Sequence, residues 1–246
     1  MTIATFFQKT LVLLSATAAL IACGANASEA VIRKAFQEKA PEIKIEKVTK
    51  TKFGGLYEIY APEWRTPIIY TDANGSFLIA GSVYDLKSGE NMTGGRLSEL
   101  TQIDFNALPF NLAFKVVKGT GARKLAVFSD PDCPFCKRLE SELNKVSDVT
   151  IHYFLLPIDS LHPQAREKSK SIWCSPDRAK AWYDFMLRDV APTAAATCDS
   201  PVDKLTEVGA KLRINGTPTI YFANGRKVPG AVPAADLEKM LTAATK

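Results

Sequence analysis

Two cysteines separated by two residues, Cys133 and Cys136, constrain the fold of this chain more than any other feature. A short apolar run at residues 125–128 precedes them, and a segment with helical periodicity follows them to about residue 146. The pattern places the pair on the first turn of a helix that directly follows a strand. Unpaired N–H groups and the macrodipole favour an anion at a helix N-terminus, so we expect the first thiol to have a low pKa.

The spacing of the two cysteines suits a reversible disulfide. Cys133 is the predicted nucleophile, because the thiolate is the form that attacks a disulfide. Cys136 is predicted to resolve the mixed disulfide by attacking Cys133. Pro134 fixes φ at a first-turn position where its missing N–H costs nothing. We expect Asp130 and Asp132 to be solvated, with Asp132 as the N-cap of the helix. The motif thus predicts a thiol–disulfide oxidoreductase.

Half of a zinc site is the alternative interpretation of this motif. Such a site needs a second pair of ligands at suitable spacing. His152 and His162 are isolated in the sequence, and Cys174 and Cys198 stand far apart. We therefore predict neither a metal site nor a cofactor, and we interpret both histidines as structural.

The N-terminal segment predicts export. Lys9 precedes a short apolar run at residues 11–22, and small residues follow that run. This pattern is typical of a secretory signal peptide, which we expect to occupy residues 1–27 and to be cleaved after Ala27. Lipidation of Cys23 at a lipoprotein signal is an open alternative. The predicted compartment is the periplasm, where disulfides form and persist.

Four cysteines remain after the predicted cleavage, and an even number in an oxidising compartment indicates two disulfides. Of the three possible connectivities, the adjacency of Cys133 and Cys136 favours a second pair between Cys174 and Cys198. We predict that the second pair is a structural disulfide worth about 3 kcal/mol on the chain-entropy account. A second redox pair that passes electrons to the first is the alternative.

Two domains with different patterns are predicted. The first, residues 28–93, reads as a helix and a sheet, and the second, residues 113–246, alternates strand and helix. A linker at 94–112 joins them, with a helix over 94–107. The order β-α-β, helical insertion, β-β-α in the second domain is the layout of a thioredoxin-like fold. In the first domain we expect a helix at 28–39, strands at 43–48, 55–60, 67–70 and 77–84, and a hairpin turn at 74–75.

A second candidate site element, Thr217-Pro218, stands immediately before an apolar strand. Proline at a strand entry marks an edge or a special turn, and next to a C-x-x-C domain we favour a cis bond here. The formal net charge of +5 is spread through stretches of mixed sign, so no nucleic-acid partner is predicted. Four aromatic residues are predicted to lie in the core of the second domain: Trp173, Trp182, Tyr183 and Phe185.

Taken together, these motifs resemble the DsbC-type disulfide isomerases of the DsbC/DsbG family. The resemblance covers essentially the whole mature chain. It rests on the segments 69–72, 80–85, 129–139, 172–174, 198–199 and 215–218.

The resemblance implies a V-shaped homodimer of mixed α+β and α/β class. Each subunit would carry a cystatin-like dimerisation domain, a linker helix and a thioredoxin-like catalytic domain with a helical insertion. Cys133 and Cys136 would face an apolar cleft that receives misfolded, wrongly disulfide-bonded exported proteins. Thr217 and Pro218 would pack against the dithiol and bind substrate backbone, and the membrane reductase DsbD would keep the dithiol reduced.

Two positions depart from the family's best-known pattern. Pro134-Phe135 stands where that pattern has Gly-Tyr, and this leaves the redox potential and the isomerase-to-oxidase balance open. Val127 stands where thioredoxin has a buried aspartate, so no base is assigned. The alternatives are a DsbG-like reductase of sulfenylated cysteines and a periplasmic holdase chaperone with secondary redox activity. The Cys174–Cys198 pair favours the DsbC side.

Overall fold

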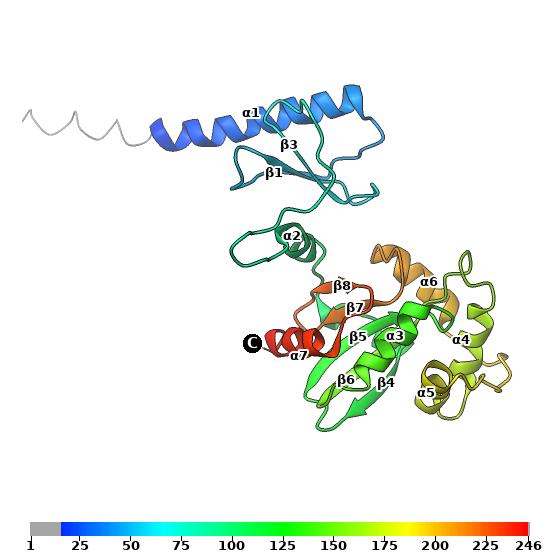
Figure 1. The fold of residues 1–246 in the computed structure, drawn as a ribbon. Coiled ribbons are helices and arrows are strands. Elements are labelled where there is room, and N and C mark those ends of the chain that lie inside the picture. Colours follow the sequence, from blue (N-terminus) through cyan, green and yellow to red (C-terminus); the bar gives the residue numbers. More distant parts are fainter. Residues whose placement is uncertain (1–15, 246) are drawn as a thin grey trace, which may run out of the picture. The chain divides into compact units, whose positions relative to one another are not determined.

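A computed structural model of the chain describes residues 16–245, with side chains from residue 27 onward. The chain divides into two compact units, with the boundary between Leu97 and Ser98, and each unit has its own sheet (Figure 1). The first 15 residues of the predicted signal peptide lie outside the described residues. Among the described helices, none combines the length and the apolar character that a membrane crossing requires.

The N-terminal unit packs a long helix, α1 (Ala16–Lys39), on a three-stranded antiparallel sheet. Its strands are β1 (Lys47–Lys50), β2 (Tyr57–Tyr60) and β3 (Ile68–Thr71), in that spatial order. The helix ends before Pro41 as predicted, but its predicted start at Ser28 is wrong. Alanine-rich sequence upstream of Ser28 has high helix propensity and contains no proline, so the helix continues back to Ala16.

The predicted strand at residues 77–84 is absent as a continuous element. In the described part of the chain, this segment makes isolated bridges, from Ile79 to Tyr70 and from Tyr84 to Asn91. The predicted turn does form, with Gly75 at a φ of +69°. Phe77, Leu78 and Ile79 remain exposed, and none of the strands in residues 16–245 covers them. A strand needs a partner along its length, and β3 supplies one only at Tyr70.

The connecting helix is shorter than predicted. Helix α2 (Met92–Leu100) ends seven residues before 107, and two 3₁₀ turns follow it, Phe105–Ala107 and Phe110–Leu112. Asp104 ends any helical continuation, because its carboxylate accepts the Asn106 N–H at 2.9 Å and starts the first 3₁₀ turn. The predicted helix over 94–107 is therefore wrong in its second half.

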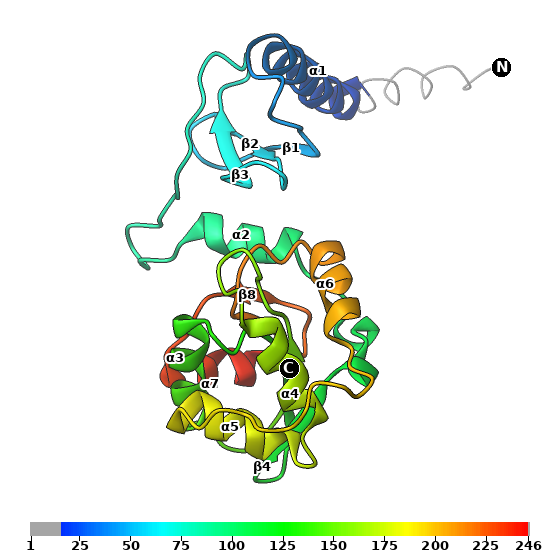
Figure 2. The ribbon, with the colours of Figure 1, turned by 90° about the vertical axis from the view of Figure 1, so that its right-hand side faces the viewer.

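The C-terminal unit is built on a five-stranded sheet with the order β4-β6-β5-β7-β8. Its two central strands, β5 and β6, are parallel, and the other pairs are antiparallel. Helices lie on both sides of this sheet (Figure 2). The elements are β4 (Phe114–Lys118), β5 (Arg123–Ser129), α3 (Pro134–Leu143), β6 (Val149–Leu155), α4 (Ala165–Cys174), α5 (Arg178–Arg188), α6 (Val202–Lys211), β7 (Thr219–Phe222), β8 (Lys227–Pro229) and α7 (Ala234–Ala243).

Edge strand β4 was not predicted. Its five residues contain two lysines and pair with β6 from Phe114 opposite Tyr153 to Lys118 opposite Val149. Lysines on an exposed edge protect a sheet against further pairing, and they also weaken the apolar alternation that marks a strand.

Side chains of the central strands alternate between two buried clusters. Leu125 and Val127 of β5 point to a cluster that includes residues of α3, α4, α5 and α7, and Ala126 and Phe128 point to one beside α6. Burial on both faces explains why β5 reads as a continuous apolar run. Trp173, Trp182 and Phe185 lie in the first cluster as predicted, with Tyr183 partly buried against it.

Candidate functional site

The dithiol lies at the transition from β5 to α3. Cys133 occupies the N-cap position with extended backbone, φ −74° and ψ 121°, and Pro134 is the first helical residue. The prediction that Asp132 caps this helix is wrong, because its carboxylate instead binds the Lys168 ammonium at 2.6 Å. No side chain caps this helix, so the first-turn N–H groups of Phe135 and Cys136 can interact with Cys133.

Both cysteines are free thiols and both are buried. The Asp130 backbone N–H donates to Cys136 Sγ at 3.4 Å, and Cys133 Sγ lies 3.3 Å from the Thr217 carbonyl oxygen. Phe135, between the two cysteines, is 58% exposed. The site thus presents one apolar side chain to solvent directly beside the dithiol.

The two thiols have opposite pKa shifts. A hydrogen bond from the Cys136 thiol is the main cause that lowers the pKa of Cys133 from 9.0 to about 6, and backbone N–H groups of the first turn add to it. Burial and the neighbouring Cys133 raise the pKa of Cys136 above the physiological range. At neutral pH the arrangement therefore holds one thiolate and one thiol, which is the state that can attack a disulfide.

Asp130 is fully buried, so the expectation that it is solvated is wrong. Its carboxylate accepts the backbone N–H groups of Asp132 and Ile158, both at 2.8 Å, and lies 2.9 Å from His162 Nδ1. These partners replace water around the buried charge. The structure thereby brings His162, which the sequence presented as isolated, to the edge of the site.

Thr217 and Pro218 are joined by a cis peptide bond. The loop is held from both sides, since Gly230 donates its N–H to the Pro218 carbonyl at 2.8 Å and the Thr219 hydroxyl donates to the Gly216 carbonyl at 2.8 Å. β7 pairs with β5, the strand that leads into the dithiol, and this brings Thr217 next to Cys133 across 84 positions of sequence.

Cys174 and Cys198 form a disulfide with a Cα–Cα distance of 5.7 Å. It ties the end of α4 to the segment between α5 and α6. Two side-chain bonds run alongside it, from Ser171 to the Ala194 carbonyl at 2.6 Å and from Trp173 Nε1 to the Asp199 carbonyl at 3.2 Å. The helical insertion is therefore closed on itself by covalent and polar links.

The buried carboxyl group of Glu140, on the same helix as Cys136, was not predicted from the sequence. Glu140 accepts hydrogen bonds from the Tyr153 hydroxyl at 2.8 Å and from Trp182 Nε1 at 3.0 Å, and burial raises its pKa to about 7. Its position four residues after Cys136, on the face that Leu139 and Leu143 also bury, is the signal that could have revealed it. In the described part of the chain no cluster of three or more potential metal ligands occurs.

A parallel β5–β6 core, a dithiol at a helix N-terminus and a cis-proline loop against it define a thioredoxin-fold dithiol protein. Comparison with known families agrees: a model of the thioredoxin-like domain matches residues 110–245, and a model of the disulfide bond isomerase N-terminal domain matches residues 23–94. The chain belongs to the DsbC family of thiol:disulfide interchange proteins. The predicted fold class and family are thus confirmed.

Individual relatives support this assignment. The chain is 36% identical over 210 residues to a probable thiol:disulfide interchange protein DsbC of Bordetella pertussis, which covers 85% of this chain and 73% of the relative. Its identity to the DsbC of Escherichia coli K12 is 29% over 178 residues, 71% of this chain and 72% of the relative. The solved disulfide interchange protein of Neisseria gonorrhoeae is 47% identical, with a TM-score of 0.55, and the match covers 56% of this chain and 99% of that one.

Proposed function

We propose that this protein reshuffles incorrect disulfides in proteins exported to the periplasm, with Cys133 as the nucleophile. The observation that supports this most is the opposed pair of pKa values, with Cys133 lowered to about 6 and Cys136 raised. A thiolate that is stable at neutral pH both attacks readily and leaves readily, and isomerisation needs both properties.

The exchange begins when the Cys133 thiolate attacks one sulfur of a substrate disulfide. An S–S bond forms between Cys133 and that sulfur, the substrate S–S bond breaks, and the second substrate sulfur leaves as a thiolate. When a different substrate thiolate attacks the mixed disulfide, a new substrate disulfide forms and the Cys133 thiolate is restored. No electrons are gained or lost over this cycle, so it isomerises the substrate.

When no substrate thiolate attacks the mixed disulfide in time, Cys136 can resolve it instead. Once Cys133 is in the mixed disulfide, the Cys136 thiol can give up its proton and attack Cys133 Sγ, which releases a reduced substrate and leaves the enzyme oxidised. The substrate gains two electrons, and a reductant must return them to the enzyme. A membrane reductase such as DsbD fits that role, which the DsbC relationship supports.

The Thr217-Pro218 loop would hold the substrate backbone during this exchange. Pro218 lies directly after the carbonyl that contacts Cys133 Sγ, so an extended substrate segment beside the loop would place its sulfur at the nucleophile. Phe135, 58% exposed, offers an apolar contact for non-polar residues next to the substrate cysteine. Cys174–Cys198 is proposed as a structural disulfide, since it lies among packed groups of the insertion.

A homodimer is the form in which we expect this protein to act. Residues 77–84 were predicted as a strand, yet Phe77, Leu78 and Ile79 are exposed, and in the described residues the segment is bridged to β3 only at Ile79. Pairing with the same segment of a second copy would complete the strand and bury these side chains. The predicted signal peptide supports the periplasmic location, with cleavage after Ala27 and lipidation at Cys23 as the two possible outcomes.

Refolding of scrambled ribonuclease in a glutathione buffer tests the function. Recovery of ribonuclease activity should be lost in Cys133→Ser and should persist at a reduced rate in Cys136→Ser, which keeps the nucleophile. Suppression of aggregation of a cysteine-free client serves as the control, because it reports binding without exchange. Normal reshuffling by Cys133→Ser would contradict the proposed mechanism.

A further inference from the structure

The loop between β6 and α4 brings a histidine to the buried carboxylate beside the dithiol. His162 Nδ1 lies 2.9 Å from Asp130 Oδ2, and its ring is still partly open to solvent. An imidazole in this position can exchange a proton with water while it stays bonded to a fully buried acid. Histidine is the side chain whose ordinary pKa lies close to neutral pH, so its charge responds to the groups bonded to it.

Asp130 connects this histidine to both cysteines. Its backbone N–H donates to Cys136 Sγ at 3.4 Å, and its carbonyl accepts the Cys133 N–H at 3.2 Å. The same residue thus holds His162 with its side chain and the dithiol with its main chain. The charge of His162 therefore interacts electrostatically with Cys133, whose side chain is itself buried.

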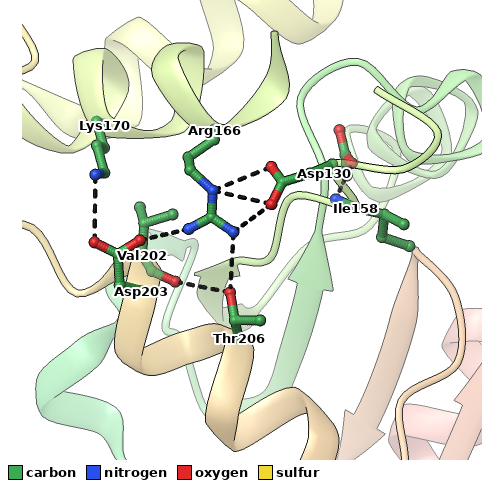
Figure 3. A network of polar contacts seen from close by, with 8 residues as sticks. Asp130, Ile158, Arg166, Lys170, Val202, Asp203 and Thr206 are labelled. Carbon is green, nitrogen blue, oxygen red and sulfur yellow. Dashed lines mark hydrogen bonds and ion pairs between the residues drawn. The ribbon is translucent and has the colours of Figure 1, made fainter. Parts of the chain in front are cut away.

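The His162 loop is anchored, so this placement is fixed by more than one contact. Its Ile158 N–H donates to Asp130, and its Asp159 carboxylate accepts from Arg166 at 3.0 Å. Figure 3 shows Arg166 of α4 reaching Asp203 and Thr206 of α6, with the bond from Ile158 to Asp130 beside it. The loop is consequently tied to the dithiol loop and to two helices.

Charges around His162 come from each neighbouring segment. The dithiol loop contributes Asp130, Asp132 and, at the N-cap of α3, the Cys133 thiolate. Helix α4 contributes Lys168, which is paired with Asp132. In the His162 loop itself, Asp159 is paired with Arg166. The bond to Asp130 is the main cause that raises the pKa of His162 above 6.5, and the charges of Cys133 and Asp132 raise it further.

We propose that His162 is a positioning residue of the dithiol, whose imidazolium offsets the buried Asp130 carboxylate and stabilises the Cys133 thiolate of the reduced enzyme. The disulfide form has no thiolate, so it gains nothing from this cation. His162 therefore shifts the thiol–disulfide equilibrium toward the reduced state. This inference rests on the proposed exchange chemistry and adds a residue that adjusts its potential.

Proton uptake on reduction follows from this coupling. When a donor dithiol reduces the Cys133–Cys136 disulfide, the donor becomes a disulfide and gives up two electrons and two protons. Cys136 takes one proton and becomes a thiol, Cys133 becomes a thiolate, and the second proton goes to solvent. The new negative charge raises the affinity of His162 for a proton, so a further fraction of a proton is taken from water. By reciprocity, protonated His162 stabilises the thiolate to the same extent.

An NMR titration of the two histidines in each redox state tests the proposal on the unmodified protein. The chain contains only His152 and His162, so one His152→Gln sample assigns both imidazole signals. His162 should titrate at a higher pH in the reduced protein than in the oxidised protein. His152, which packs in β6 against Phe110, should titrate alike in both states. Equal His162 midpoints in the two states would overturn the inference.

A second measurement uses His162→Gln, which keeps an N–H donor for Asp130 but carries no charge. In glutathione buffers below the His162 midpoint, the variant should favour its disulfide by a factor of about three to ten over the natural protein. The factor should fall toward one as the pH rises and the natural histidine loses its proton. A merely structural role would give a difference that does not depend on pH, and this would refute the proposal.

These readouts separate the inference from the proposed function. Histidine midpoints and the glutathione equilibrium depend only on a working dithiol, whereas ribonuclease reshuffling depends on substrate exchange. A protein that reshuffles ribonuclease while its His162 midpoint ignores the redox state would retain the function and lose this inference. A protein whose His162 midpoint depends on the redox state but which does not reshuffle ribonuclease would retain the His162 coupling and contradict the isomerase proposal.

Discussion

The hydrogen bond between the two thiols makes a quantitative prediction about Cys133. With a pKa of about 6, roughly 90% of Cys133 is thiolate at pH 7, compared with about 1% for a cysteine with the unperturbed pKa of 9.0. The largest contribution comes from the Cys136 thiol. A hydrogen bond to a charged group is worth roughly 1.5–3 kcal/mol, which corresponds to about one to two pH units.

Two variants of one residue isolate that bond. Cys136→Ala removes the donor and should raise the Cys133 midpoint by about one to two pH units, whereas Cys136→Ser keeps a donor and should stay close to the natural value. The midpoint is read from the pH dependence of iodoacetamide alkylation of the reduced protein, with mass spectrometry to locate the label. If Ala and Ser variants titrate alike, the Cys136 donor does not set the pKa of Cys133. A midpoint near 9 in the natural protein would refute the whole electrostatic account.

Three further outcomes are expected. The folded-state pKa of Glu140 is about 7 and lies above its ordinary value of 4.5, so its stabilising contribution is complete below pH 4.5 and is lost as the pH rises toward 7. In urea unfolding, Glu140→Gln should therefore gain up to about 3 kcal/mol of unfolding free energy relative to the natural protein between pH 4.5 and 7. A difference that stays constant over this pH range would contradict the prediction. Replacing both Cys174 and Cys198 by Ser should lower the unfolding free energy by about 3 kcal/mol while Cys133 alkylation is unchanged, and an altered alkylation midpoint would count against a purely structural disulfide. Sedimentation at micromolar concentration should give a monomer for Ile79→Lys. The control Leu86→Lys should remain a dimer, because Leu86 is already 98% exposed. Equal effects of the two substitutions would argue against pairing through residues 77–84.

The elements of the catalytic unit could be predicted because local signals and tertiary packing agree there. Residues 219–222 form a short run that is buried throughout as a strand, and Asn224-Gly225 supplies the turn after it. Asp177 caps α5 by accepting the Lys180 N–H at 2.9 Å. Where a strand depends on its neighbour, the sequence is less informative. β4 is stabilised by β6, whereas residues 77–84 make only two isolated bridges within the described part of the chain.

Some residues of the candidate site could likewise be predicted from local sequence, and others could not. The dithiol and Thr217-Pro218 carry recognisable motifs, because their chemistry requires particular residues at a fixed spacing. Asp130, Glu140 and His162 carry none, since each acquires its role from partners that are distant in sequence, such as Ile158 for Asp130 and Trp182 for Glu140. An acidic residue in a polar stretch reads as solvated until the fold covers it.

The short 3₁₀ segment after α2 determines what a minimal catalytic fragment must contain. Phe105 and Leu108 pack in the cluster beside α6, and the Ile103 N–H donates to the Gly225 carbonyl at 3.1 Å. A Cβ added at Gly225 would lie 1.8 Å from the Ile103 carbonyl oxygen, so the two chain segments touch backbone to backbone. A fragment cut at residue 113 would remove Phe105 and Leu108 from the cluster beside α6 and the Ile103 contact from the β7–β8 turn. Domain dissection of this protein should therefore begin its catalytic piece at Ser98, where the compact unit itself begins.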